Sequence, residues 1–114
     1  MVHTGTYVSS GLCPHHTLFL GIFWGAEGGL ITCVRTSLIL DEARCDSYGK
    51  GFGLAVTFSS NQGPISIFNV HVHPHWNPET RLSFFKDASR HIVRHPGFIS
   101  FVLGDFNTVN EGEF

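Results

Sequence analysis

Two short polar segments carry residue types that could act together in hydrolysis. One is FNVHVHPH, where Asn69 and His71 lie two residues apart, and the other is FVLGDFN, where Asp105 and Asn107 do. A histidine exchanges protons near neutral pH, a carboxylate orients water or binds a hard cation, and an amide donates hydrogen bonds to a developing oxyanion. These groups suit metal-assisted attack of water on a phosphate ester.

Each polar pair follows an apolar run that is typical of a β-strand. The runs cover residues 65–72 and 98–103. Side chains alternate along a strand, so Asn69 and His71 should share a face, and so should Asp105 and Asn107. If the two strands are parallel neighbours, or nearly so, both pairs emerge at one edge of the sheet, where α/β proteins place their sites.

The segment between these strands predicts an amphipathic helix. Asn77 is a good N-cap and Pro78 suits the first turn. The predicted apolar stripe consists of Leu82, Phe85, Ala88 or Ser89, and Ile92. Pro96 and Gly97 end the helix. Its basic residues predict either a solvated face or a phosphate-tracking surface, with Arg81, Lys86 and Arg90 as the candidate substrate contacts.

The rest of the chain predicts further strands and two loops. Strands are expected at 18–24, 30–35 and 54–59, and irregular loops at 1–17 and 41–53. Short turns favour antiparallel pairing of the early strands, whereas the helix favours parallel pairing of the last two. The expected fold class is α/β (α+β), a mixed β-sheet with one main helix in a single domain, or part of one, over residues 1–114. The strand at 98–103 is apolar on both faces, as a covered central strand would be.

Composition sets broad limits on function. The 114 residues are 42% hydrophobic and 14% charged, with a formal charge of −2, which favours a packed domain and neither supports nor excludes a phosphate-bearing substrate. Cys13, Cys33 and Cys45 form an odd set without C-x-x-C spacing and predict free thiols. The odd set of free cysteines and the lack of a clear signal peptide favour an intracellular location (cytoplasm or nucleus), and no apolar run is long enough to span a bilayer.

Four segments together resemble a known superfamily. They are GGLITCVR, GLAVTFSS followed by GPISIFNVHVHP, a helix opening with PETR, and FVLGDFNT. From about Leu18 to Thr108 the chain resembles the endonuclease/exonuclease/phosphatase superfamily, which has the DNase I-like fold. The resemblance implies part of a four-layer α/β sandwich. It also implies cleavage of phosphodiesters, or of phosphomonoesters, with Mg²⁺ or Mn²⁺.

The resemblance also implies roles for individual residues. His71 would act at the scissile phosphate, Asp105 would orient or deprotonate the attacking water, and Asn107 would contact the phosphate and its developing charge. Asn69 would support the site. Apurinic-type nucleases and many retrotransposon endonucleases are similar but have a tyrosine where His71 stands. The substrate class stays open among DNA, RNA, phosphoinositides and lipid headgroups.

Two departures from the superfamily pattern affect the expected activity. The early Gln-Glu dipeptide that supplies its metal-binding glutamate does not occur, so no metal ligand is assigned, and Glu27 lies in a turn. The final Asp-His pair lies beyond the segment present, since seven residues follow Asn107. The chain is therefore expected to be an internal fragment, inactive by itself, with an uncovered sheet face that favours self-association or aggregation.

Two alternatives remain open from the residues. HVHPH also resembles the HxH strand end of metal-dependent amidohydrolases, in which His71 and His73 would share a Zn²⁺ ion. Those enzymes are (β/α)₈ barrels with helices between all strands. The other alternative is a non-catalytic degenerate fragment or interaction module.

Overall fold

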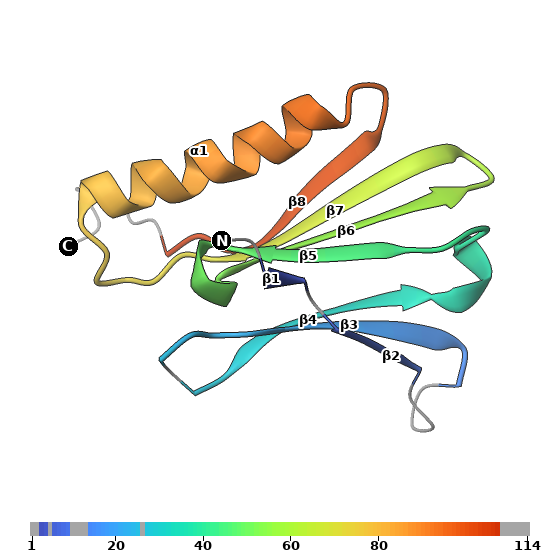
Figure 1. Cartoon of the computed structure of the whole chain (residues 1–114), viewed down its shortest axis with the longest axis horizontal. Coiled ribbons are helices and arrows are strands. Elements are labelled where there is room, and N and C mark those ends of the chain that lie inside the picture. Colours follow the sequence, from blue (N-terminus) through green and yellow to red (C-terminus); the bar gives the residue numbers. More distant parts are fainter. Residues whose placement is uncertain (1–2, 5, 10–13, 26, 108–114) are drawn as a thin grey trace.

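The computed structural model describes residues 3–4, 6–9, 14–25 and 27–107, which form two β-sheets and one long helix. The larger sheet has the strand order β1-β5-β6-β7-β8, and the smaller sheet has the order β2-β3-β4. Figure 1 shows helix α1 on one side of the larger sheet and the smaller sheet on the other. The fold class is therefore mixed α and β, in three layers.

The elements follow one another in a simple order. The first four strands are β1 (His3–Thr4), β2 (Thr6–Ser9), β3 (His16–Ile22) and β4 (Gly29–Arg35). After the 3₁₀ turn η1 (Thr36–Leu38) come β5 (Arg44–Tyr48), the 3₁₀ turn η2 (Gly49–Gly51), β6 (Gly53–Ser60) and β7 (Gly63–His71). Helix α1 (Pro78–Arg94) and β8 (Ile99–Asp105) complete the described chain.

Strand pairing agrees with the predicted directions. The hairpins β3–β4 and β6–β7 are antiparallel, whereas β7 and β8 are parallel neighbours joined through α1. The helix starts as predicted, because the Asn77 side chain accepts a hydrogen bond from the Thr80 amide at 2.8 Å and Pro78 occupies the first turn. Within the described ranges, no helix is long and apolar enough to cross a membrane.

Two hydrophobic clusters hold the layers together. Between α1 and the larger sheet, the buried side chains include Tyr48, Phe68, Val70, Phe84 and Ala88. Between the two sheets, they include Phe19, Leu30, Val34, Leu54 and Val56. The alternation of β6 explains how it serves both layers, because successive side chains of a strand point to opposite faces.

The predicted loops and the single sheet need correction. The segment 41–53 contains β5 and η2, and the segment 1–17 contains β1, β2 and the start of β3. The polar residues and glycines of these segments give no strand pattern in the sequence. The strands form because neighbouring strands supply backbone hydrogen-bond partners. The early strands also divide between two sheets, so the smaller sheet covers one face of the larger.

The prediction of a covered central strand at 98–103 was wrong. Strand β8 lies at the edge of the larger sheet, and all seven of its residues are exposed. The reason is the placement of the covering layers. Helix α1 and the smaller sheet both pack on side chains of β5, β6 and β7, and neither hydrophobic cluster includes a residue of β8.

The predicted helical stripe was also shifted. The structure buries Phe84 and Ala88 and partly buries Phe85. Leu82 is 57% exposed and Ile92 is 38% exposed. The helix packs on β5, β6 and β7 through Phe84 and Ala88, and the rest of its apolar surface stays in contact with water.

Candidate functional site

The structure brings His71 and Asp105 together at one end of the larger sheet. They are register partners at the carboxyl ends of β7 and β8. The His71 Nδ1 and Asp105 Oδ2 atoms lie 3.9 Å apart, and the two side chains are 32% and 59% exposed. This separation is too long for a hydrogen bond, but it allows an electrostatic interaction when the imidazole is protonated.

Two aromatic rings hold the His71 imidazole. Phe23 follows β3, and its ring stacks on His71 with centroids 5.6 Å apart. Phe52 follows η2, and its ring stacks at 6.0 Å. The two phenylalanines stack on each other at 4.3 Å, and the His71 amide donates to the Phe52 carbonyl at 2.8 Å. The imidazole is therefore positioned by both sheets and is only partly open to water.

Sequence reasoning missed these two phenylalanines. Phe23 was placed inside a predicted strand, and Phe52 in a predicted loop. Their contact with His71 depends on how the β3–β4 hairpin packs against η2, where the Trp24 amide donates to the Lys50 carbonyl at 2.9 Å. No local pattern in the sequence signals such a contact.

Asn107 joins the ends of the two parallel strands. Its side-chain nitrogen donates to the Val72 carbonyl at 2.6 Å, and its backbone amide donates to Asp105 Oδ1 at 3.0 Å. Its φ of 43° lies in the left-handed region, which asparagine tolerates better than most residues. Asn107 therefore fixes the turn that presents Asp105, and part of its donor capacity is already used for that purpose.

Asn69 lies farther along β7 and contacts the smaller sheet. Its side-chain nitrogen donates to the Ile31 carbonyl at 3.0 Å and to the Thr32 hydroxyl at 3.3 Å. Both partners belong to β4. Asn69 thus ties the two sheets together two residues from His71, which is a supporting position.

The three candidate basic residues lie in different surroundings. Arg81 reaches the end of β8, with Nη2 donating to the carbonyl oxygens of Asn107 at 3.5 Å and Pro74 at 3.4 Å. Arg90 pairs with Asp87 on the helix surface at 2.9 Å, and Lys86 is exposed. Of the three, Arg81 is therefore the residue that contacts the segment following β8.

Shifted pKa values lie away from this pair. Burial, with the nearby Asp46 charge, raises the pKa of Cys45 to about 11. Burial, with the Asp87 charge, raises the pKa of Tyr48. Burial lowers the pKa of His91. Cys33 and Cys45 are free thiols as predicted, and Cys13 lies outside the described residues.

The described residues do not form a metal centre. No group of three or more His, Cys, Asp or Glu side chains comes together among them. His73 Nδ1 accepts a hydrogen bond from the His75 amide at 3.1 Å, and its ring lies near Trp76. The sheets are also mainly antiparallel, unlike the (β/α)₈ barrel of the amidohydrolase alternative.

No protein-family model, curated protein or solved structure matches this chain.

Proposed function

We propose that His71, Asp105 and Asn107 belong to a hydrolytic centre that acts on phosphate esters, with phosphodiesters as the favoured class. The observation that carries this proposal is the register of β7 and β8. It sets an imidazole and a carboxylate 3.9 Å apart at the carboxyl ends of two parallel strands. The resemblance of the NVH and GDFN strand ends to the endonuclease/exonuclease/phosphatase superfamily supports the same function, and a partial DNase I-like fold is part of the proposal.

Each side chain has a chemical role in this proposal. A protonated His71 would bind a phosphate oxygen and stabilise the negative charge that grows there during attack. Asp105 would accept a proton from the attacking water. Asn107 holds Asp105 through its backbone amide. Arg81 adds positive charge beside the end of β8.

The Mg²⁺ or Mn²⁺ ion implied by the superfamily is not assigned to residues here. The described segments offer Asp105 at this edge but no group of three potential ligands. A hard cation of this kind usually needs one or two carboxylates together with substrate oxygens. We therefore expect binding of a phosphodiester, but little or no turnover, from residues 1–114 alone.

The proposal is tested by NMR of the histidine rings in the full chain. Dimethyl phosphate is titrated with and without Mg²⁺, and the His71 ring signals should shift in a saturable way. Asp105→Asn should change this response severalfold, because it removes the carboxylate charge that lies 3.9 Å from the His71 imidazole. His75→Gln removes an exposed histidine outside the pair and serves as the control.

The companion measurement is hydrolysis of bis(4-nitrophenyl) phosphate with Mg²⁺ or Mn²⁺. Turnover that Asp105→Ala abolishes would support the centre and contradict the expected inactivity of the isolated chain. A titration that leaves the His71 signals unchanged, or changes them equally in the Asp105→Asn variant, would contradict the proposal.

A non-catalytic interaction module is the second candidate function. It is favoured by the exposed apolar side chains of β8, where Phe101 is 47% exposed and Leu103 is 55% exposed. Within the described residues, no strand pairs with the outer edge of β8. An exposed apolar edge strand is a template for pairing with another chain.

A further inference from the structure

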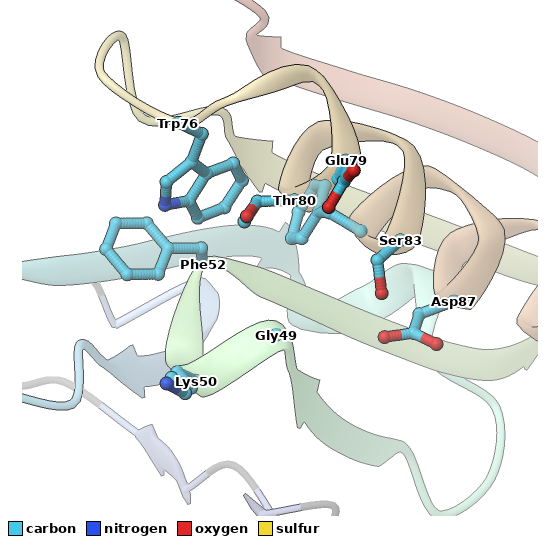
Figure 2. Close-up of a pocket in the computed structure, with 9 residues that line it drawn as sticks. Gly49, Lys50, Phe52, Trp76, Glu79, Thr80, Ser83 and Asp87 are labelled. Carbon is cyan, nitrogen blue, oxygen red and sulfur yellow. The ribbon is translucent and has the colours of Figure 1, made fainter.

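A cavity of about 390 Å³ lies between the first half of α1, the turn η2 and the loop before α1. Figure 2 shows Trp76 and Phe52 on one side of it and the polar side chains of α1 on the other. The described residues that line it include neither His71 nor Asp105. The volume is in the range of small-molecule sites.

Mutual packing fixes the aromatic side of the cavity. The ring centroids of Phe52 and Trp76 lie 5.1 Å apart, and so do those of Trp76 and Phe84. Phe84 is 3% exposed and Phe52 is 9% exposed, whereas Trp76 is only partly buried. The neighbouring rings therefore hold the Trp76 indole in place, and part of it stays open to a ligand.

Gly49 leaves space beside these rings. Its φ of 57° is left-handed, and a Cβ atom added there would lie 2.7 Å from Phe84 Cδ2. A side chain at this position would strain the backbone and displace Phe84. The shape of the cavity therefore depends on a glycine at this position.

The charged groups around the cavity balance one another. Asp87 is paired with Arg90, whose Nη1 atom lies 2.9 Å from Asp87 Oδ1. Glu79 and Lys50 contribute one charge of each sign to the lining. A carboxylate in the first turn, such as Glu79, also interacts favourably with the helix dipole. The cavity therefore has no net charge that would offset the cost of desolvating a charged ligand.

Two hydroxyl groups offer polar contacts that do not depend on charge. Thr80 and Ser83 are three residues apart on α1, so they lie on the same side of the helix, and both line the cavity. Figure 2 shows their hydroxyl groups on the cavity side of α1. A hydroxyl group both donates and accepts hydrogen bonds, so this pair suits a hydroxyl group on a ligand.

We propose that this cavity binds a small, uncharged aromatic alcohol. The ring of the ligand packs against Trp76 and Phe52, and its hydroxyl group forms hydrogen bonds with Thr80 and Ser83. Contacts between aromatic rings add to the free energy gained from apolar burial. This inference goes beyond the proposed hydrolytic function and does not depend on it.

Three probes of similar shape test the preference for an uncharged ligand. At pH 7, 2-phenylethanol is neutral, phenethylamine is a cation and phenylacetate is an anion. Binding to the full chain is followed by the NMR shifts of the backbone amides that line the cavity. The alcohol should bind at least about threefold more tightly than either ion, because the ions lose more hydration on binding. Added salt should leave the affinity for the alcohol unchanged, since no charged pair forms.

Substitutions then assign the binding to the cavity. Thr80→Val and Ser83→Ala should each weaken alcohol binding roughly threefold, as the loss of one hydrogen bond does. Trp76→Leu should weaken it by about the same factor or more, whereas Trp76→Phe keeps a ring and should retain most of the affinity. Ser89→Ala removes an exposed hydroxyl group from the same helix outside the cavity and is the matched control.

Four outcomes would overturn the proposal. They are the absence of saturable shifts, an affinity for either ion that equals that for the alcohol, equal effects of Ser83→Ala and Ser89→Ala, and equal effects of Trp76→Phe and Trp76→Leu. The amide spectrum of each variant shows whether the fold is retained. Thr80→Val and Ser83→Ala alter exposed side chains, so they test the site even if a substitution of Trp76 prevents folding.

Discussion

At the scale of single residues, each member of the candidate site has a distinct position and set of contacts. His71 and Asp105 face each other at two strand ends, and Asn107 fixes the turn between Asp105 and the end of β7. The sequence named all three as candidates from their types and positions, and their roles stay a prediction. It did not reveal that the Asn107 side chain donates to the Val72 carbonyl, or that the rings of Phe23 and Phe52 stack on the His71 imidazole. These contacts join segments that are far apart in the chain.

A second residue-scale property is a pH dependence of stability that comes from His91. Its ring packs on Tyr48 and Phe68, with centroids 5.2 and 6.0 Å away, and burial lowers its pKa. Asp46 and Asp87 oppose this shift, whereas Arg94 and His95 add to it. The folded state therefore binds this proton less readily than the unfolded chain does.

We expect stability to fall as the pH drops below about 6.5, the ordinary pKa of histidine, because the unfolded state is then protonated first. The loss ends when the pH passes below the lowered folded pKa. Urea unfolding at pH 7.5 and 5.5 measures the effect. His91→Gln should reduce the difference between the two pH values, whereas His75→Gln, at an exposed position, should keep it. An unchanged difference in His91→Gln would contradict this assignment.

At the scale of elements, the pairing of β7 with β8 decides where the polar strand ends meet. The sequence predicted both strands, the intervening helix and its N-cap, because each has a strong local signal. It missed β1, β2 and β5. Their sequences lack alternating apolar residues, and they form strands because neighbouring strands supply hydrogen-bonding partners. It also missed that β8 is an edge strand, since apolar residues on both faces do not show what covers them.

Gly104 is the residue that this pairing depends on most closely. It has a φ of 141°, and a Cβ atom added there would overlap the Val70 carbonyl oxygen in the adjacent strand. We expect Gly104→Ala to lower the free energy of unfolding by roughly 2 kcal/mol, as strained backbone positions do. It should also disturb the His71 ring signals.

Chemical denaturation and NMR test this prediction. Ser100→Ala, at an exposed position on the same strand, is the control and should change stability by less than about 0.5 kcal/mol. A Gly104→Ala variant as stable as the parent, with an unchanged His71 spectrum, would show that β8 can shift to accept a side chain.

At the scale of the whole molecule, the three layers leave the β8 edge of the larger sheet uncovered. Figure 1 shows α1 and the smaller sheet on opposite faces of the larger sheet, with β8 at its margin. Phe101 and Leu103 are exposed on one face of β8, and Val102 is 40% exposed on the other. On the adjoining helix, Leu82 is 57% exposed. A strand added beside β8 would pair with its outer backbone groups, and the apolar side chains would extend the apolar surface available to a partner on either face.

We expect the chain to self-associate in a concentration-dependent manner through β8. Val102→Lys places a charge on this strand and should shift the population toward monomer, because charged edge residues oppose strand pairing. Analytical ultracentrifugation at several concentrations measures the change. Ile22→Lys alters a side chain that is 76% exposed in the smaller sheet and is the matched control. A parent chain that stays monomeric at high concentration, or an equal effect of both substitutions, would contradict this.

The sequence by itself determined the local features of this protein. It indicated a mixed α and β fold, the strong strands, the capped helix, and a histidine, a carboxylate and an amide at two strand ends. These follow from periodicity and capping, which act over a few residues. Only the tertiary structure decided that there are two sheets, that β8 is exposed, that Phe23 and Phe52 hold His71, and that a cavity lined by Trp76 and Phe52 forms beside α1. Those outcomes depend on how the layers pack against each other. Packing brings together residues that are far apart in the chain, and no local sequence pattern indicates such contacts.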